Sequence, residues 1–256
     1  PDEKGQRMIA SFRTLKGLIN KHMNDILAKL SQKLIVSCQA LEDEPLHGSQ
    51  IMARMAEAAC MGGAAGIRAN TVQDIQAIRQ VTNVPIIGII KKEYPDSDIY
   101  ITPTMLEVDA LVEEGAEIIA MDATNRLRPG GKRLEEFFRE VRQRHARLFM
   151  ADTAQFEEGV LAQQLGFDLV GTTLSGYTPE TRNRKLPDIA LMKKYVRHLS
   201  VPIIAEGGIS SPQELQQVMN TGVLAAVVGS AITRPMYITR MYTSALDQPA
   251  DIAGSK

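Results

Sequence analysis

The segment Val201-Pro202-Ile203-Ile204-Ala205-Glu206-Gly207-Gly208 is followed by a second one, Ala225-Ala226-Val227-Val228-Gly229-Ser230. Each is an apolar run of strand length that ends in small residues, with a helical pattern after it. Two such units form a phosphate cradle when they are the last two strands of a (β/α)₈ barrel. The glycines let backbone N–H groups approach an anion closely. Glu206 would then stand at the carboxyl end of a strand, where barrel enzymes keep catalytic carboxylates.

The same alternation of strand and helix patterns runs through the chain from residue 34. The expected strands are rich in Ile, Val and Ala without strict alternation, which is typical of strands buried on both faces; they are Leu34–Ala40, Gly66–Ala69, Pro85–Lys91, Glu117–Ala123, Arg147–Thr153, Asp168–Ser175, Val201–Gly207 and Ala225–Ser230. The expected helices are Ser49–Met61, Val72–Val81, Met105–Glu114, Arg133–His145, Gln155–Leu165, Asp188–Leu199, Pro212–Asn220 and Pro235–Ala245. Eight β–α units predict an α/β fold, a single TIM barrel over residues 34–256.

A doubly wound open sheet is the alternative fold. That fold more often carries a Gly-rich dinucleotide turn after its first strand, and Cys38-Gln39-Ala40-Leu41-Glu42 is not such a turn. Three expected loops, residues 92–104, 124–132 and 176–187, follow strands and would therefore lie over the mouth of a barrel. Ser211-Pro212 is expected to start a helix, and Gly62, Gly115, Gly166 and Gly222 are expected to end helices in the left-handed conformation.

Residues 1–33 form an N-terminal extension with apolar residues at helical spacing. We expect an additional helix there that closes the bottom of the barrel or packs on a partner. An organelle presequence is the alternative, which the acidic Asp2, Glu3 and Asp25 disfavour. Met8 is a candidate start, so residues 1–7 are interpreted as a cloning remnant.

The composition of the chain argues against a nucleic-acid-binding, membrane-binding or disulfide-rich protein. The chain has 256 residues, 29 basic and 30 acidic side chains, and a net charge of −1, so no basic excess indicates a nucleic-acid or anionic-membrane partner. Two cysteines, Cys38 and Cys60, give no disulfide framework and favour a cytoplasmic location. No apolar run approaches the roughly 18 residues that a membrane span needs.

Polar residues gather at the expected carboxyl ends of the strands, where a barrel keeps its functional groups. In chain order these are Gln39, Arg68, Lys91, Asp122, Asp152, Thr172-Thr173, Glu206 and Gly229-Ser230. Several opposite charges aimed at one place are costly to bury unless they are paired or used. The pattern therefore predicts an active site at this end of the barrel, with Thr173 among its binding residues.

Lys91 and Glu206 are the candidate acid–base groups. A lysine in a partly dry barrel mouth can have a lowered pKa and act as a base or form a Schiff base. The alternatives are that Lys91 extends to water, that Lys92 is the inward lysine, or that Glu206 only pairs with Lys91 or Arg68.

Four further residues have two interpretations each. Asp152 could position a lysine or a sugar hydroxyl, and Asp122 could do the same or cap the loop that follows it. Arg68 and Arg234 are candidate anion binders, because guanidinium groups fit phosphate and carboxylate. For each arginine the alternative is an ordinary ion pair with a neighbouring acid.

A metal site is not expected. The four histidines, His22, His47, His145 and His198, are scattered, and no His or Cys pair has ligand spacing. Strand alternation turns Cys38 towards the helices, which favours a buried structural thiol over a nucleophile.

Seven motifs carry a resemblance to one known family: Leu34-Ile35-Val36-Ser37-Cys38-Gln39-Ala40-Leu41 with Asp43-Glu44-Pro45-Leu46, Gly66-Ile67-Arg68-Ala69, Pro85-Ile86-Ile87-Gly88-Ile89-Ile90-Lys91, Tyr100-Ile101-Thr102-Pro103-Thr104, Ala120-Met121-Asp122-Ala123-Thr124, Gly171-Thr172-Thr173-Leu174-Ser175-Gly176-Tyr177-Thr178, and Val228-Gly229-Ser230-Ala231-Ile232-Thr233-Arg234-Pro235. From residue 34 onward the chain resembles the N-acetylmannosamine-6-phosphate 2-epimerases. The resemblance implies a (β/α)₈ barrel, commonly dimeric, that acts in bacterial sialic-acid catabolism without metal or cofactor. The implied reaction inverts C2 of an N-acetylhexosamine 6-phosphate, from N-acetylmannosamine 6-phosphate to N-acetylglucosamine 6-phosphate.

Site residues follow from the resemblance position by position. Lys91 matches the catalytic lysine of the family and Glu206 its catalytic glutamate. The matching substrate-site residues are Gln39, Arg68, Asp152 and Arg234. One departure is Gly208, which stands where the family usually has a larger residue, so a phosphate contact there would either be missing or come from the backbone alone.

The chemistry of such an inversion suits two acid–base groups on opposite sides of C2, one removing a proton and one returning it. The phosphate would be held by backbone N–H groups at Gly207-Gly208 and Gly229-Ser230. Two alternatives stay open: another phosphate-binding barrel enzyme, such as an aldolase, with a Schiff base on Lys91, or a phosphosugar-binding module without catalysis.

Overall fold

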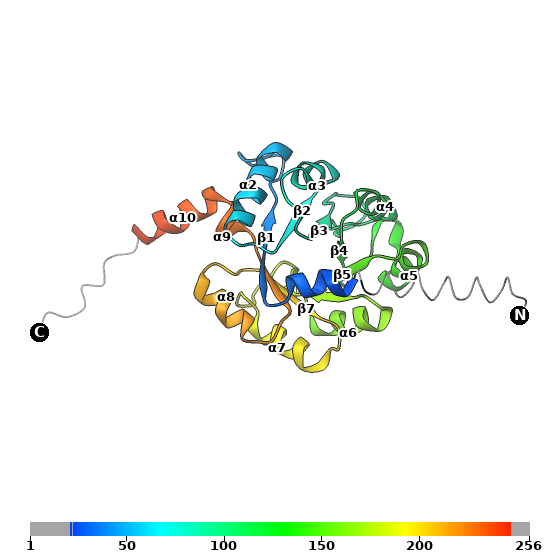
Figure 1. Ribbon diagram of the computed structural model, residues 1–256. Helices are drawn as coiled ribbons and strands as arrows, with labels where there is room; N and C mark the ends of the chain where they lie inside the picture. The colour runs from blue at the N-terminus through cyan, green and yellow to red at the C-terminus, as the bar shows by residue number, and fades with distance from the viewer. Residues whose placement is uncertain (1–20, 22, 247–256) are drawn as a thin grey trace, which may run out of the picture.

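Eight parallel strands close into a barrel in which each strand pairs with the next along the chain and β8 pairs with β1. The structure is a computed structural model, which describes residue 21 and residues 23–246. The strands are β1 (Lys33–Cys38), β2 (Gly66–Asn70), β3 (Ile86–Ile89), β4 (Ile118–Asp122), β5 (Leu148–Asp152), β6 (Leu169–Gly171), β7 (Ile203–Glu206) and β8 (Ala225–Val228). Figure 1 shows them at the centre of a ring of helices. The predicted (β/α)₈ barrel is confirmed, and the open sheet is excluded.

Helices follow the strands and cover the outside of the barrel (Figure 1). They are α2 (Ser49–Met61), α3 (Val72–Arg79), α4 (Met105–Glu113), α5 (Leu134–Arg144), α6 (Phe156–Leu165), α7 (Ile189–His198), α8 (Pro212–Met219), α9 (Ser230–Thr233) and α10 (Pro235–Leu246), with a short 3₁₀ turn at Pro129–Gly131. Unlike the others, α10 extends away from the ring in Figure 1, and none of its residues is buried.

The core has two layers because side chains alternate across each strand. On β3, for example, Ile86 packs in the layer between strands and helices, whereas Ile87 and Ile89 point into the barrel. Cys38 belongs to the outer layer, as strand alternation predicted. Burial on both faces explains why the strands have continuous apolar sequences.

The N-terminal helix described over residues 23–30 closes one end of the barrel interior. Ile26 is 5% exposed and Leu30 is fully buried, and both pack in the inner layer with residues such as Ile35 and Ile87. Figure 1 shows this blue helix lying across the centre of the barrel. Of the two roles expected for the helix, these contacts match barrel closure. The interpretation of residues 1–7 lies outside the described residues.

Seven of the strands are shorter than the sequence predicted, and only β2 runs one residue further, to Asn70; this corrects several boundaries. Expected runs to Ala40, Lys91, Ser175, Gly207 and Ser230 stop at Cys38, Ile89, Gly171, Glu206 and Val228. Beyond those points the chain turns over the barrel mouth, so the neighbouring strand no longer offers a ladder partner.

Helix ends agree with the predictions except at one glycine. Ser211 caps α8, accepting a hydrogen bond from the Glu214 N–H with Pro212 at the first position, as expected. Gly166 ends α6 in the left-handed conformation. Gly62, by contrast, has φ −78° and keeps the right-handed helical conformation, so its predicted left-handed stop is wrong.

Candidate active site

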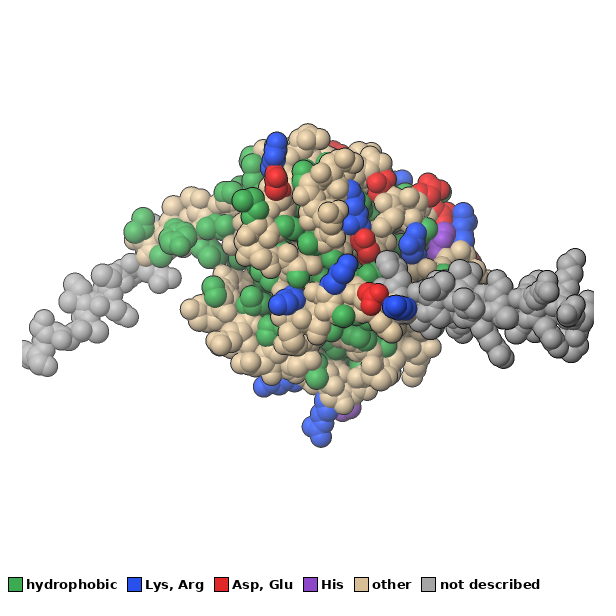
Figure 2. Space-filling model, viewed as in Figure 1, with side chains coloured by type: hydrophobic (Ala, Val, Ile, Leu, Met, Phe, Trp, Pro, Cys, Tyr) green, Lys and Arg blue, Asp and Glu red, His purple; other side chains and the backbone are tan. Residues whose placement is uncertain are grey.

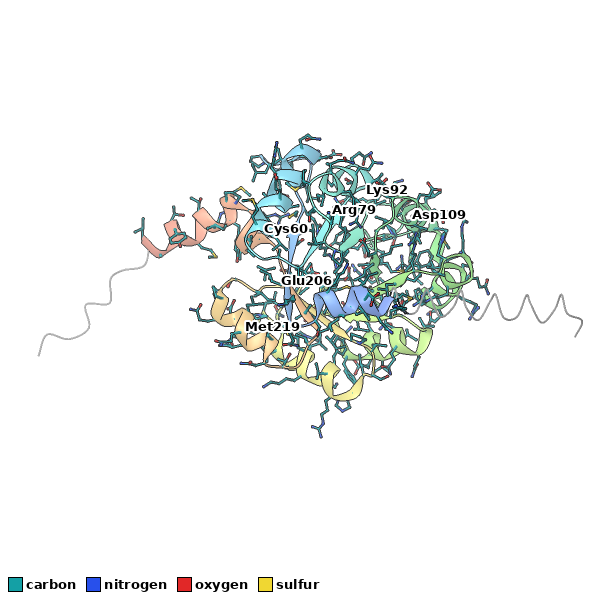
Figure 3. The ribbon with its side chains drawn as sticks, in the orientation of Figure 1. Cys60, Arg79, Lys92, Asp109, Glu206 and Met219 are labelled. Carbon is teal, nitrogen blue, oxygen red and sulfur yellow. The ribbon has the colours of Figure 1, made fainter. Side chains whose placement is uncertain are left out.

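A cavity of about 250 Å³ opens at the carboxyl ends of the strands. Its lining draws on residues far apart in sequence and includes ten of the predicted site residues: Gln39, Arg68, Lys91, Thr173, Glu206, Gly207, Gly208, Gly229, Ser230 and Arg234. In Figure 3 the labelled Glu206 lies near the centre of the ring of helices, whereas Lys92 lies near its edge. The strand ends thus bring the predicted residues to one place.

Arg68 links two carboxylates beneath the cavity. Its Nη2 donates to Asp152 Oδ2 at 2.6 Å and its Nη1 to Asp152 Oδ1 at 3.2 Å. Nη1 also lies 3.0 Å from Glu206 Oε2. The Thr173 hydroxyl donates to Asp152 Oδ1 at 2.6 Å and lies 3.3 Å from Glu206 Oε2. These four side chains form one connected network.

Asp152 is the member of this network that does not reach the cavity. Its side chain is fully buried, and the cavity is lined instead by its partners Arg68 and Thr173. A bidentate contact of this kind fixes the plane of a guanidinium group. Asp152 therefore orients Arg68 from behind.

Glu206 is protonated more readily than an ordinary glutamate. Burial of the carboxyl, together with the charge of Asp152, raises the pKa of Glu206 to about 7, although Arg68, Lys91 and the Thr173 hydroxyl act in the opposite direction. The group can therefore hold or release a proton near neutral pH, as a general acid or base must.

Lys91 is the inward lysine of the Lys91-Lys92 pair. Burial, and then the charges of Arg68 and Arg234, lower the pKa of Lys91 to about 8, against the opposing effect of Glu206. Lys92 is half exposed and lies 3.6 Å from Glu107, and it does not line the cavity. The neutral amine that a base requires is thus accessible at Lys91.

The backbone of the predicted cradle has the special geometry that glycine supplies. Gly207 and Gly208 have φ of 110° and 69°, which side chains with a Cβ rarely adopt. A Cβ on Gly208 would also collide with the Cβ of Leu186. The loop before α7 thus fills the space that a larger residue at position 208 would need.

Arg234 lies between α9 and α10, at the edge of the cavity. Its Nη2 pairs with Glu44 Oε2 at 2.9 Å, and its side chain is 33% exposed. The ion-pair interpretation is confirmed, whereas anion binding by Arg234 stays a prediction that its place in the cavity lining allows.

Asp122 does not reach the cavity, in line with the capping alternative. It is fully buried and accepts hydrogen bonds from the Thr124 N–H at 2.9 Å and the Thr124 hydroxyl at 2.7 Å. Arg126 pairs with its second oxygen at 2.6 Å.

Several lining residues were not predicted, among them Ser37, Tyr100, Ile101, Tyr177, Thr233 and Tyr237. Tyr100 and Tyr177 belong to loops that were expected over the mouth, so their position in the sequence was a usable signal. Tyr237 comes from α10, and nothing in the sequence around it indicated a site residue.

The described part of the chain has neither a metal-binding cluster nor a membrane-spanning helix. No group of three or more His, Cys, Asp or Glu side chains among residues 21 and 23–246 is placed to hold a metal ion. Within the same residues, every helix is too short or too polar to cross a membrane.

Comparison with known proteins gives a family match over most of the chain. Residues 52–248 match the family model described as "Putative N-acetylmannosamine-6-phosphate epimerase". A protein of Clostridioides difficile named "Putative N-acetylmannosamine-6-phosphate 2-epimerase" is 52% identical over 222 residues, which cover 87% of this chain and 99% of that protein.

Solved structures give the same result. The chain resembles the N-acetylmannosamine-6-phosphate 2-epimerase of Clostridium perfringens with a TM-score of 0.83 and 50% identity, covering 86% of this chain and 96% of that one. A thiamine phosphate pyrophosphorylase from Pyrococcus furiosus, with a TM-score of 0.55 and 18% identity over 86% of this chain and 99% of that one, shares the fold alone.

Proposed function

The chain belongs to the N-acetylmannosamine-6-phosphate epimerase family, and on that basis we propose that it converts N-acetylmannosamine 6-phosphate to N-acetylglucosamine 6-phosphate by inverting C2. The observation that carries the proposal is that Lys91 and Glu206 line the same cavity, and that the pKa of each is moved towards neutrality. Groups of this kind suit the removal and return of a proton next to a carbonyl carbon.

The proposed reaction needs only proton transfers. In the ring-opened sugar, one group takes the proton from C2, and the electron pair of the broken C–H bond moves onto the C1 oxygen. Lys91 and Glu206 act as the acid–base pair, one removing the proton and the other returning one to the opposite face of C2. Arg68 offers donors beside this pair, so it would stabilise the negative oxygen of the intermediate.

The phosphate would hold the sugar from a distance. The backbone at Gly207-Gly208 and Gly229-Ser230, with Arg234 beside it, lines the same cavity as Lys91. Binding energy from a remote phosphate orients the reacting carbon and raises the rate of the chemical step. Gln39 and Thr173 line the same cavity and complete the proposed binding residues.

Proton NMR with N-acetylmannosamine 6-phosphate in D₂O tests this function. We expect the gluco epimer to appear with deuterium at C2, because the abstracted proton exchanges with solvent. Lys91→Ala and Glu206→Gln should each lower turnover by orders of magnitude. Lys92→Ala is the matched control, since Lys92 lies outside the cavity, and it should keep turnover near wild type. Unchanged turnover in both active-site variants would contradict the assignment.

A Schiff base on Lys91 is the second candidate, because a lysine with a lowered pKa also attacks carbonyl carbons. Borohydride treatment in the presence of substrate separates the two mechanisms. A stable adduct on Lys91 would favour the Schiff base, whereas deuterium exchange without an adduct favours the acid–base pair.

A homodimer and a cytoplasmic location belong to the same proposal. Figure 2 shows hydrophobic side chains gathered over α10, where Met236, Met241, Tyr242 and Leu246 are exposed. A second copy of the chain could cover such a surface. Both cysteines are free thiols, as in the reducing cytoplasm.

A further inference from the structure

The backbone of Lys91 lies beyond the end of its own strand. The last residue of β3 is Ile89, so the regular sheet ladder does not extend to Lys91. A largely buried backbone N–H still needs a hydrogen-bond acceptor. The acceptor of this hydrogen bond therefore helps to fix the position of the Lys91 backbone, from which the side chain extends.

On one side, Lys91 faces the loop that follows it, in an isolated antiparallel bridge with Ile101. The hydrogen bonds of this bridge come from the neighbouring residues: Lys92 N–H donates to the Tyr100 carbonyl at 2.9 Å, and Thr102 N–H donates to the Ile90 carbonyl at 2.8 Å. In this arrangement the paired residues do not bond to each other. The N–H of Lys91 therefore points away from Ile101.

On the other side stands Asn70, the last residue of β2. Its side-chain Oδ1 accepts the hydrogen bond from the Lys91 N–H at 2.8 Å. Because a backbone N–H can only donate, the amide oxygen must be the atom that faces it. The contact therefore has a defined direction.

Asn70 is itself held rigidly. It is 5% exposed and pairs with Ile89 in the β2–β3 ladder. The following residue, Thr71, donates its N–H to the Ile89 carbonyl at 3.0 Å and accepts from the Asp74 N–H at 3.1 Å as the cap of α3. The backbone that carries the Asn70 side chain is therefore anchored on both sides, and this limits where the amide oxygen can lie.

We propose that Asn70 is a positioning residue, whose amide oxygen replaces the missing ladder partner and fixes the Lys91 backbone so that its amine faces the cavity. The inference rests on the proposed role of Lys91 as an acid–base group. It also explains the choice of an amide: aspartate would offer the same acceptor, but its negative charge beside Lys91 would favour the protonated lysine and move its pKa away from neutrality.

The test compares Asn70→Ala with a control that lies just before the amino end of β3. Thr82 is 8% exposed and accepts a partly buried hydrogen bond from the Val84 N–H at 3.3 Å, so Thr82→Val removes a hydrogen bond of a residue that does not line the cavity. We expect Asn70→Ala to lower kcat by about 10- to 100-fold with little change in KM, because a small displacement of a reacting group costs rates of this size. Thr82→Val should have the kcat of the wild type, even if it lowers the melting temperature as much as Asn70→Ala does.

Asn70→Asp keeps the acceptor and gives a second readout. The limb of the pH profile that reports Lys91 should move to higher pH, because a negative charge at position 70 favours the protonated lysine. The charged groups that already act on Lys91 are Arg68 on β2, Arg234 between α9 and α10, Glu206 on β7 and Glu44 after β1. These four groups are unchanged in Asn70→Asp, so a shift of the Lys91 limb is due to the new charge at position 70.

Two results would overturn the inference: a kcat for Asn70→Ala no lower than that of Thr82→Val, or a Lys91 limb that does not move in Asn70→Asp. Both are distinct from failure of the proposed function. Full turnover in Lys91→Ala would remove the acid–base role itself, whereas an inactive Lys91→Ala with an unaffected Asn70→Ala would remove only the role of Asn70.

Discussion

Arg68 contacts the two carboxylates of the site unequally. Burial alone would lower the pKa of its guanidinium, but Asp152 and Glu206 together raise it above the usual value, so Arg68 stays charged. Asp152 accepts two hydrogen bonds from Arg68 and is fully buried, while Glu206 shares only one end of the guanidinium and is 15% exposed. Glu206 is therefore the carboxyl that meets the cavity, where a substrate can reach it.

The pH dependence of turnover follows from Glu206 and Lys91. Their pKa values of about 7 and about 8 mean that below the first both groups are protonated and no base is present. Above the second both are deprotonated, and no acid can return a proton. We expect kcat/KM, which reports the free enzyme, to be bell-shaped with its maximum between these values.

This profile is measured by the NMR assay from about pH 6 to pH 9, a range that covers both limbs of the bell. The substrate phosphate titrates near pH ~6, below both limbs, so it does not mimic them. A profile that is flat across this range would contradict the assignment.

At this scale the sequence named the residues and offered Arg68 as a partner of Glu206, which the structure confirms, but it did not give the partners of the two aspartates. Asp122 and Asp152 both end apolar runs and pair with each other in the β4–β5 ladder, so they look equivalent in sequence. In the structure Asp152 turns to Arg68 and Asp122 to Arg126. The difference depends on arginines from other elements, which strand periodicity cannot place.

Among the elements, the β7–α8 turn couples the phosphate cradle to the loop before α7. Gly208 has φ 69°, and the side chain of Leu186 fills the space beside it. Gly208→Ala therefore adds a steric collision to the backbone cost of about 1–2 kcal/mol for a left-handed residue. We expect a loss of stability above that cost and an increase in KM, because the turn that would hold the phosphate must move.

Gly131→Ala separates these two effects. Gly131 has φ 71°, nearly the same as Gly208, but nothing lies within 4 Å of an added Cβ. Urea denaturation and steady-state kinetics should show only the backbone cost for Gly131→Ala, with KM unchanged. Equal stability losses and equal KM values in the two variants would show that Leu186 does not constrain the cradle.

Element order was predictable because apolar runs and amphipathic stretches have different periods. The ends of the strands and helices were harder to predict: Lys91 continues an apolar run, yet β3 ends at Ile89. The short helix α9 was missed because Ser230 follows the apolar run of β8 without a helical period. Where a strand ends depends on its neighbours in the closed barrel, and the sequence of a single segment does not contain that information.

For the whole molecule, stability and chemistry lie at opposite ends of the barrel. The cavity is formed by the carboxyl ends of the strands, while Leu30 of the N-terminal helix packs at their amino ends, beside Gly66. In a barrel, residues at this second end support stability rather than catalysis.

Leu30→Ala tests that separation. Leu30 is fully buried, and truncating a buried leucine costs about 2–5 kcal/mol, since apolar contacts are lost and a cavity remains. We expect urea denaturation to show that loss, and kcat and KM for the phosphosugar to stay near wild type, because the substitution leaves every cavity-lining residue in place. Leu27→Ala, on the same helix but only partly buried, should cost less. A fall in kcat in Leu30→Ala under conditions where the protein remains folded would mean that the helix also sets the geometry of the active site through the barrel interior.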